Sequence, residues 1–335
     1  MMSTMSVGGW LHACDRTTRV VVLTVGTAAV FAYVVFRLRR FGRCTSQTDL
    51  TGKTVVVTGA NSGMGYCTAL DMARRNARVI LASPYMQLAE KAKAKIIEAT
   101  GNQNVVVRFL DLGSMASVRQ FVQEIKQESR LDILVNNAGV INLEQKITED
   151  GLEINMAVNY FGHFLLTVEL LDLLKKSTPS RIVNISSIAH KNSRMKTADM
   201  EYLLNDTSVS PFRKYATTKL AIVLFTRELA RRLDGSGVTA YAVDPGYVAT
   251  NIGKTLPMIT KLLFLPFALV TKSAEVGAQT AIYCAVSDEV KGQSGKYYAE
   301  CRLAEDSVHP LANDLEATRK LWELSEKWTK PTLSC

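Results

Sequence analysis

Tyr215 and Lys219 stand four residues apart in the segment YATTK. On a helix this spacing puts both side chains on one face, one turn apart. A phenol with a pKa of about 10 is a poor acid or base at neutral pH, but a neighbouring cation favours the phenolate and lowers that pKa. The pair could therefore exchange a proton with a substrate oxygen, and the ammonium could also donate to the ribose of a cofactor. Such pairs also occur on solvated helix faces. Whether this pair is catalytic therefore has to be judged from the other polar residues around it.

Two serines and an asparagine could complete this proton-transfer group. Ser186 and Ser187 follow the apolar run Ile182–Ile185, at the carboxyl end of a predicted strand, where open α/β sheets bind ligands. A hydroxyl there could hold a substrate oxygen, although serines at strand ends also cap local backbone. Asn159 lies in an apolar helical segment, and a buried amide needs hydrogen-bond partners. We therefore expect Asn159 to belong to a hydrogen-bond network.

A glycine-rich turn, TGANSGMG at residues 58–65, follows the first predicted strand and opens a helix. Glycines let the chain turn tightly and bring backbone N–H groups close to a pyrophosphate at the positive end of the helix. An ordinary strand-to-helix turn is the alternative for the glycines taken alone. The second strand that follows the helix favours a dinucleotide site. Its expected cofactor-binding residues are Gly59, Asn61, Ser62, Gly63, Met64 and Gly65.

The residues after the second predicted strand bear on which dinucleotide binds. An acid near this point usually contacts the ribose of NAD, and a basic residue accommodates the 2′-phosphate of NADP. The sequence has Ser83, Pro84 and Tyr85 here, so neither charge is present. Because no acid stands ready for NAD, we expect NADP(H) to be favoured, with NAD(H) as the alternative.

Apolar, β-rich runs alternate with longer amphipathic stretches after residue 52, which is typical of parallel strands joined by crossover helices. Strands are expected at Thr54–Thr58, Arg78–Ala82, Asn104–Leu110, Leu131–Asn136, Arg181–Ser186, Val238–Val243 and Lys296–Tyr298. The clearest helices are expected at Met64–Arg75, Leu152–Lys176, Tyr215–Leu233 and Leu311–Trp328. The pattern predicts an α/β fold: a single doubly wound Rossmann domain with a parallel sheet, over residues 45–335.

Residues 20–36 carry no charge and are just long enough to approach a bilayer-spanning helix. A cleaved signal peptide is the alternative, but the run starts late and is followed by arginines, beginning at Arg37, instead of a cleavage site. The more basic C-terminal flank places the rest of the chain in the cytosol. Residues 1–44 are therefore predicted to form a single-pass transmembrane anchor with its linker.

Composition excludes several other classes of function. The net charge of +9 comes largely from arginines beside the apolar run, which favours contact with membrane lipid, and no nucleic-acid-binding motif accompanies it. The six cysteines are scattered, without histidines at ligand spacing, so neither a metal site nor a disulfide framework is expected. His163 and His190 are interpreted as packing or surface residues.

An apolar stretch at Ile252–Lys272 is bounded by lysines and interrupted by prolines, which argues against a simple spanning helix. We expect a lid that rests in the membrane interface and admits a hydrophobic substrate. A core helix is the alternative.

Six motifs in order resemble the short-chain dehydrogenase/reductase family over Gly52–Trp328. They are TGANSGMG at 58–65, NNAG at 136–139, VNYFGHF at 158–164, NISS at 184–187, YATTK at 215–219 and DPGYVAT at 244–250. The longer segments SRIVNISSIAH and KLAIVLFTRELARRL resemble the microsomal retinol dehydrogenases within that family. The sequence departs from their usual pattern at Tyr66 and Pro84, where that subgroup has Lys and Arg.

The resemblance implies a role for each matching residue. Tyr215 would be the general acid/base, Lys219 would lower its pKa and bind the nicotinamide ribose, and Ser187 would polarise the substrate oxygen. Asn159 would hold a water that links Lys219 to solvent. The remaining cofactor contacts would come from Asp111 at the adenine, Asn137 beside the sheet, and Pro245, Gly246 and Thr250 near the nicotinamide.

The resemblance also implies the reaction and its setting. The expected function is hydride transfer between a nicotinamide cofactor and a hydrophobic alcohol or aldehyde, most simply retinol and retinal. Prenols, sterols and fatty aldehydes are alternative substrates, and a membrane-anchored dinucleotide-binding protein without turnover is the non-enzyme alternative. The expected location is the endoplasmic reticulum membrane, with the mitochondrial and lipid-droplet membranes as alternatives. Because long helices such as Leu152–Lys176 often pair in this family, a homodimer is one expected form.

Overall fold

The computed structural model describes residues 15–38, 41–144, 146–248 and 271–330. The chain forms two compact units, and the described residues from Gly42 onward, other than Thr271, belong to the larger one. The smaller unit contains helix α2 (Arg16–Leu38), which covers the charge-free run predicted at 20–36. Its apolar side chains include Val25, which is 63% exposed, and Phe31, which is 71% exposed. Across the described ranges, none of the helices combines the length and hydropathy needed to cross a membrane.

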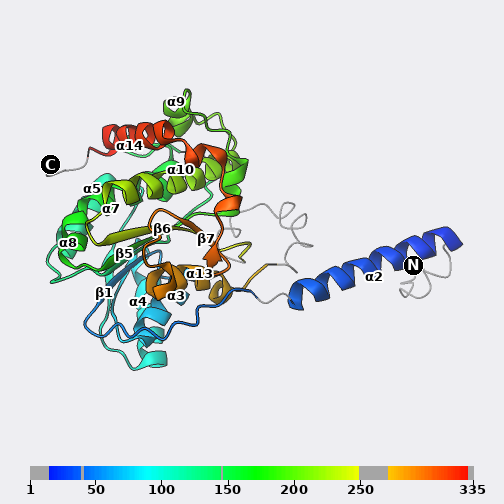
Figure 1. Ribbon diagram of the computed structural model, residues 1–335, viewed down its shortest axis with the longest axis horizontal. Coiled ribbons are helices and arrows are strands. Elements are labelled where there is room, and N and C mark those ends of the chain that lie inside the picture. The colour runs from blue at the N-terminus through cyan, green and yellow to red at the C-terminus, as the bar shows by residue number, and fades with distance from the viewer. Residues whose placement is uncertain (1–14, 39–40, 145, 249–270, 331–335) are drawn as a thin grey trace, which may run out of the picture. The chain divides into compact units, whose positions relative to one another are not determined.

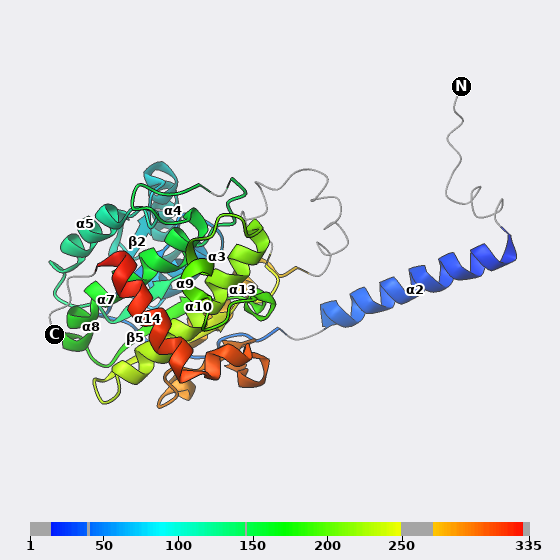
Figure 2. The same ribbon diagram turned by 90° about the horizontal axis from the view of Figure 1, so that it is seen from above.

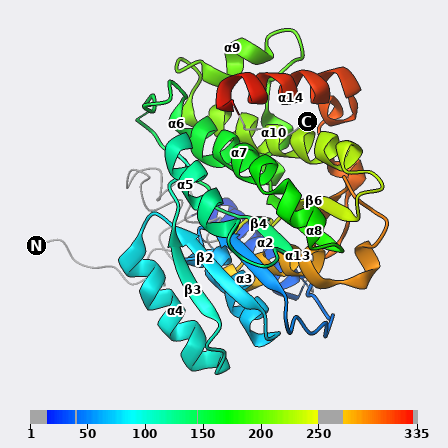
Figure 3. The ribbon, with the colours of Figure 1, turned by 90° about the vertical axis from the view of Figure 1, so that its left-hand side faces the viewer.

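The larger unit is built on an eight-stranded sheet in the order β3-β2-β1-β4-β5-β6-β7-β8, in which only the last pairing is antiparallel. Strands β2, β3, β4 and β6 of this sheet are labelled in Figure 3. The strands are β1 (Thr54–Thr58), β2 (Arg78–Ser83), β3 (Val105–Phe109), β4 (Ile133–Asn136), β5 (Ser180–Ile185), β6 (Val238–Asp244), β7 (Tyr297–Ala299) and β8 (Arg302–Leu303). All seven expected strands form, within two residues of their predicted limits at each end. The short edge strand β8 was not expected.

Helices cover both faces of the sheet (Figure 1). One layer holds α3 (Gly63–Arg74), α4 (Met86–Thr100) and α13 (Ala274–Val286), and the other holds α5 (Met115–Ile125), α7 (Gly162–Glu169), α8 (Leu171–Lys176), α10 (Pro211–Arg232) and α14 (Leu315–Thr329). Strand side chains alternate between the two cores: Val55 and Val57 of β1 pack in one, and Val56 packs in the other. The doubly wound Rossmann fold predicted from the sequence is confirmed.

Short elements connect these layers at the ends of the strands. They are α6 (Ile154–Met156), η1 (Ala157–Phe161), η2 (Ile188–Asn192), α9 (Met200–Asn205), η4 (Asp288–Val290), η5 (Glu305–Ser307) and η6 (Pro310–Asn313). Because β1 and β4 are neighbours while the chain winds outward from them in both directions, a ligand site is expected outside their carboxyl ends.

The helix expected at Leu152–Lys176 forms over most of its length, but it is irregular. Helix α6, the π-helical turn η1 and α7 follow one another without a break, and α8 begins after Leu170. Gly162 follows the π turn and lies against the loop between β3 and α5. A Cβ on Gly162 would be 2.4 Å from the Leu112 carbonyl oxygen in that loop. A π turn inserts an extra residue and often marks a functional position, and here it contains Asn159.

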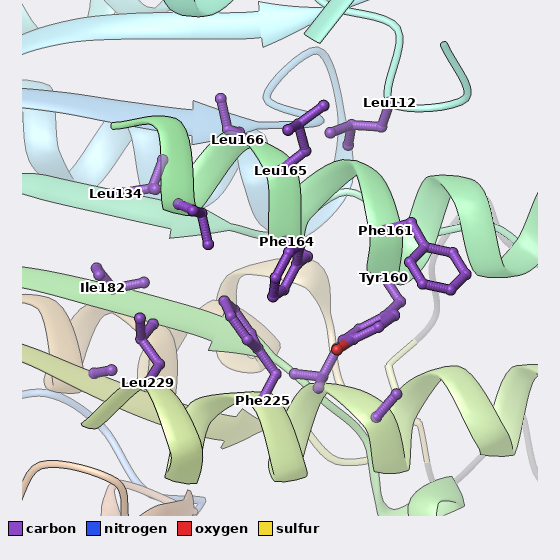
Figure 4. Packing of buried hydrophobic residues seen from close by; sticks show 14 of the residues in the cluster. Leu112, Leu134, Tyr160, Phe161, Phe164, Leu165, Leu166, Ile182, Phe225 and Leu229 are labelled. Carbon is purple, nitrogen blue, oxygen red and sulfur yellow. The ribbon is translucent and has the colours of Figure 1, made fainter. Parts of the chain in front are cut away.

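An aromatic cluster fixes helix α10 against α7 and α14, which are seen as ribbons in Figure 2. Figure 4 shows Tyr160, Phe164 and Phe225 of this cluster. The rings of Phe164 and Phe225 lie 5.4 Å apart, and Trp322 of α14 packs against both, at 5.0 and 5.9 Å between centroids. The Tyr160 hydroxyl also hydrogen-bonds to Ser325 at 2.8 Å. This packing holds α10, which carries Tyr215 and Lys219, in one position over the sheet. The homodimer expected through the long helix stays a prediction.

Candidate active site

The turn between β1 and α3 requires its glycines for two different reasons. Gly59 and Gly63 adopt positive φ angles of 66° and 58°, which glycine accepts at little cost. Gly65 has no room for a side chain, because a Cβ there would lie 2.5 Å from both the Gly59 carbonyl oxygen and Asn137 Nδ2. Asn137 in turn donates its side-chain amide to the Thr58 carbonyl at 2.8 Å. The turn is therefore held close to the loop after β4.

A cleft of about 770 Å³ opens beside this turn. Its lining includes Gly59, Asn61, Ser62, Gly63, Met64, Gly65, Pro84, Tyr85, Asp111, Asn137, Gly139 and Val140. A Cβ at Gly63 would meet nothing within 4 Å, so the amino terminus of α3 has open space in front of it. Its first backbone N–H groups and the helix dipole suit a phosphate there. The cleft therefore fits a dinucleotide, and the expected residues from 59 to 65, Asp111 and Asn137 all line it.

At the end of the cleft next to β2, Ser83, Pro84 and Tyr85 carry no charge. Ser83 donates its hydroxyl to Asn61 Oδ1 at 3.0 Å and accepts the Tyr85 N–H at 3.0 Å. Asp111, also in the lining, accepts the Gly113 N–H at 2.8 Å. No acidic side chain is present among Ser83, Pro84 and Tyr85 to repel a 2′-phosphate.

Tyr215 and Lys219 lie on one face of α10, as their spacing predicts. The Lys219 ammonium is 5.5 Å from the centroid of the Tyr215 ring and donates to the Ile185 carbonyl at 2.7 Å. Ser187, just beyond the end of β5, hydrogen-bonds to the Tyr215 phenol. Ser186 points elsewhere, since its hydroxyl donates to the Lys219 carbonyl at 2.8 Å. The structure thus brings Ser187, Tyr215 and Lys219 together.

Burial dominates the protonation of this group. It raises the pKa of Tyr215 to about 12, against the opposing effect of the Ser187 hydrogen bond. It lowers the pKa of Lys219 to about 8, against the opposing charge of Asp244. The helix spacing predicts that Lys219 lowers the pKa of the phenol, but the ammonium is held by the Ile185 carbonyl and the larger influence on the phenol is loss of solvent. At neutral pH Tyr215 is therefore protonated.

Asn159 connects the cleft to helix α10, which carries Tyr215 and Lys219. It is fully buried, accepts the Val140 N–H at 2.7 Å and donates to the Val140 carbonyl at 2.9 Å and to Thr218 Oγ1 at 3.3 Å. The hydrogen-bond network predicted for this residue is confirmed. Since Val140 lines the cleft and Thr218 precedes Lys219, Asn159 sets the distance between the two parts of the site.

The sequence interpretation missed the part that His163 plays here. Its Nδ1 lies 3.1 Å from the Asn159 carbonyl oxygen and its Nε2 lies 2.9 Å from Thr58 Oγ1. Thr58 Oγ1 also accepts the N–H groups of Asn137 and Ala138, each at 2.9 Å. Nδ1 must donate to the carbonyl, so Nε2 accepts from Thr58. The four-residue spacing of Asn159 and His163 on one helix was the signal that could have indicated this link.

Acid should destabilise the protein through His163. Burial lowers its pKa from 6.5 to about 4, so between these values the unfolded chain binds a proton that the folded chain does not. Stability should therefore fall as pH falls from 6.5 to 4, by up to about 3 kcal/mol from this residue. His163→Gln should show a shallower loss of unfolding free energy in that window, measured by chemical denaturation at several pH values. His309→Gln, at a partly exposed histidine, should change the slope less, and equal slopes in wild type and His163→Gln would contradict the prediction.

The expected nicotinamide loop is described only in part. Asp244 accepts the Gly246 N–H at 2.8 Å, and Gly246 has a φ of 77°, so Pro245 and Gly246 form a defined turn at the end of β6. Thr250 and residues 252–270 of the expected lid lie outside the described residues. Ser187, Tyr215, Lys219 and this turn are not among the described residues that line the cleft; Asn159 and its neighbours join them to it.

Comparison with known proteins identifies the family. Residues 53–199 and 205–258 match the profile of the family described as short chain dehydrogenase. The chain belongs to the short chain dehydrogenase family. Retinol dehydrogenase 13 from Homo sapiens is 42% identical over 309 residues, covering 90% of this chain and 92% of the relative. Human retinol dehydrogenase 14 is 41% identical over 330 residues, covering 92% and 97%.

Two solved structures are similar to this fold. A protein described as putative and uncharacterised from Mycobacterium paratuberculosis has a TM-score of 0.68 and 33% identity, over 87% of this chain and 98% of its own. A gluconate 5-dehydrogenase from Beutenbergia cavernae, described as NAD(P)-dependent and with bound NADP, has a TM-score of 0.62 and 26% identity, over 75% and 96%. As a family member with these relatives, the chain is an NAD(P)-dependent alcohol dehydrogenase or carbonyl reductase. This replaces the alternative of a binding protein without turnover.

Proposed function

We propose that the protein interconverts retinol and retinal, with Ser187, Tyr215 and Lys219 as its catalytic residues. The observation that carries the proposal is the placement of these three polar groups together, at the carboxyl end of β5 and in the first turns of α10, beside a cleft that fits a dinucleotide. The retinoid is supported by relatives named retinol dehydrogenases, which align along about nine tenths of both chains.

The proposed chemistry uses the protonation state described above. Ser187 donates a hydrogen bond to the carbonyl oxygen of the aldehyde, which makes the carbon more electrophilic. A nicotinamide cofactor, when bound, would provide the hydride for reduction of that carbon and would accept it in the reverse direction. In reduction, Tyr215 transfers its phenolic proton to the oxygen and is left as the phenolate. In oxidation, Tyr215 must first lose its own proton to solvent, after which the phenolate takes the hydroxyl proton. The balance of the two directions follows the supply of reduced and oxidised cofactor.

Lys219 and Asn159 have supporting roles in the proposal. An ammonium held near the Tyr215 ring stabilises the phenolate that forms during reduction. Asn159 keeps the cleft loop at Val140 next to Thr218 and thereby aligns bound substrate with the catalytic helix. Its proposed water contact toward Lys219 completes a route by which the phenolate regains a proton.

We further propose that NADP(H) is the favoured cofactor. Asn61 and Ser62 line the end of the cleft next to β2. Ser83 hydrogen-bonds to Asn61, and residues 83–85 include no acid. An acid at this point would repel a 2′-phosphate and favour NAD. Pro84 stands where the retinol dehydrogenases usually have an arginine, so the preference over NAD(H) is expected to be modest.

The proposal places the enzyme at the endoplasmic reticulum membrane, with α2 as a single-pass anchor and the catalytic unit in the cytosol. Support comes from the exposed apolar side chains of α2 and from the arginines at residues 37–43, which follow its charge-free run. Protease added to intact microsomes should digest the catalytic unit. Protection of that unit would contradict the orientation.

The central experiment is an assay of the detergent-solubilised full chain with NADPH and NADH against retinal, a prenal, a sterol ketone and a fatty aldehyde. We expect the highest kcat/KM for retinal with NADPH. A higher value for another substrate would move the assignment to that lipid class, and a large advantage for NADH would overturn the cofactor preference.

A further inference from the structure

Lys272 is a buried lysine that the proposed chemistry does not use. It is the last residue of the segment expected to form the lid, and its side chain is 6% exposed. Its ammonium forms an ion pair with Glu300 and donates to the Pro245 carbonyl at 3.1 Å. The lysine therefore links the turn after β6 to the turn between β7 and β8.

Lys272 also determines the space around that first turn. Its backbone N–H donates to the Tyr247 carbonyl at 2.7 Å, and it pairs with Val248 in a short parallel bridge. A Cβ on Gly246 would lie 2.9 Å from Lys272 Nζ. The lysine side chain thus contacts the turn directly, so the position of Pro245 and Gly246 depends on it.

Glu300 is the partner of Lys272 in the ion pair. It occupies the turn between β7 and β8 with a positive φ of 53°, and its Oε2 accepts the Gly42 N–H at 3.1 Å. A Cβ on Gly42 would lie 2.0 Å from the Glu300 carbonyl oxygen, so only glycine allows the chain to pass so close. One carboxylate therefore engages both Lys272 and the segment at Gly42 with which the larger unit begins.

We propose that Lys272 and Glu300 are a positioning pair that sets the Pro245–Gly246 turn, and with it the nicotinamide end of the cofactor site, and joins that turn to Gly42. The inference rests on the proposed placement of the nicotinamide beside this turn. A buried ammonium that loses its carboxylate is strongly destabilised where it stands. Removal of Glu300 should therefore shift Lys272 and release the Pro245 carbonyl.

The test separates the two ends of the cofactor site. Glu300→Gln and Lys272→Met are prepared in the full chain, and the affinities for NADPH and for ADP-ribose, which lacks the nicotinamide ring, are measured by calorimetry. Both variants should bind NADPH about tenfold more weakly and ADP-ribose within about twofold of wild type, with kcat lower by about 10- to 100-fold. Gly42→Ala should weaken NADPH binding in the same selective way if the link to Gly42 contributes.

Lys296→Met is the matched control, because Lys296 is a half-exposed lysine 4.0 Å from Glu305 on the same edge of the sheet. It should bind both ligands as wild type does. Glu300→Gln is the deciding variant. Because the Glu300 side chain is 35% exposed and that of Lys272 only 6%, Glu300→Gln should disturb folding less than Lys272→Met. If Glu300→Gln bound NADPH and ADP-ribose with equally reduced affinity, or with unchanged affinity, the proposed positioning role of the pair would be overturned. Wild-type protein that failed to bind NADPH would instead refute the proposed function.

Discussion

Replacement of Tyr215 with phenylalanine is expected to lower kcat for retinal reduction by about 100- to 10,000-fold, the usual contribution of a positioned general acid or base. Phenylalanine keeps the ring beside Lys219 but removes the proton that the aldehyde oxygen must receive. NADPH affinity should stay within about twofold of wild type, since the cleft-lining residues are unchanged. Single-turnover kinetics with saturating NADPH would measure the loss in the chemical step.

Tyr283→Phe is the matched control for this variant. The Tyr283 hydroxyl donates to Glu289 at 2.8 Å, and both residues lie away from the catalytic group, on α13 and η4. Loss of that hydrogen bond should cost about 1 kcal/mol of stability and leave kcat unchanged. If Tyr215→Phe retained more than about a tenth of the wild-type kcat, Tyr215 would not be the proton donor.

The second large effect is expected at Gly65. In Gly65→Ala the new Cβ would lie 2.5 Å from the Gly59 carbonyl oxygen, a backbone atom that cannot turn aside as a flexible side chain can. The turn must move to relieve this contact, at a cost of about 1–3 kcal/mol. NADPH affinity measured by calorimetry should therefore fall by about 5- to 150-fold, with a parallel loss of kcat/KM.

Gly26→Ala on α2 is the matched control for this glycine, because a Cβ on Gly26 would meet nothing within 4 Å. It should leave NADPH affinity unchanged. An NADPH affinity of Gly65→Ala within twofold of wild type would show that the β1–α3 turn does not hold the pyrophosphate as proposed.

The strands and the glycine turn could be predicted from the sequence because their signals are local. Strand β1 is buried at every residue and reads as a continuous apolar or β-branched run. The π turn within the helix at Leu152–Lys176 could not be predicted, since it accompanies the close contact of Gly162 with Leu112. These two residues are fifty positions apart, and no periodicity within the helix reports the contact.

In the candidate site, too, some features could be predicted from the local sequence and others could not. The spacing of Tyr215 and Lys219 made them candidates, and the strand end offered both Ser186 and Ser187. The family resemblance selected Ser187 and gave each of the three its proposed role. The pKa of Tyr215 was not predictable, because burial outweighs the nearby ammonium and burial depends on elements distant in sequence. The roles of Thr250 and of the expected lid stay predictions.

The sequence by itself determined which chemical groups this short chain dehydrogenase has and which of them share a helix face or a tight turn, because those relations follow from the fixed geometry of one to two turns of chain. The tertiary structure decided how the groups act. Burial in the fold raises the pKa of Tyr215 and keeps the phenol protonated. The fold also joins Thr58 to Asn159 through His163 and pairs Lys272 with Glu300. Solvent exclusion and long-range hydrogen bonds exist only in the packed fold, so no local pattern contains them.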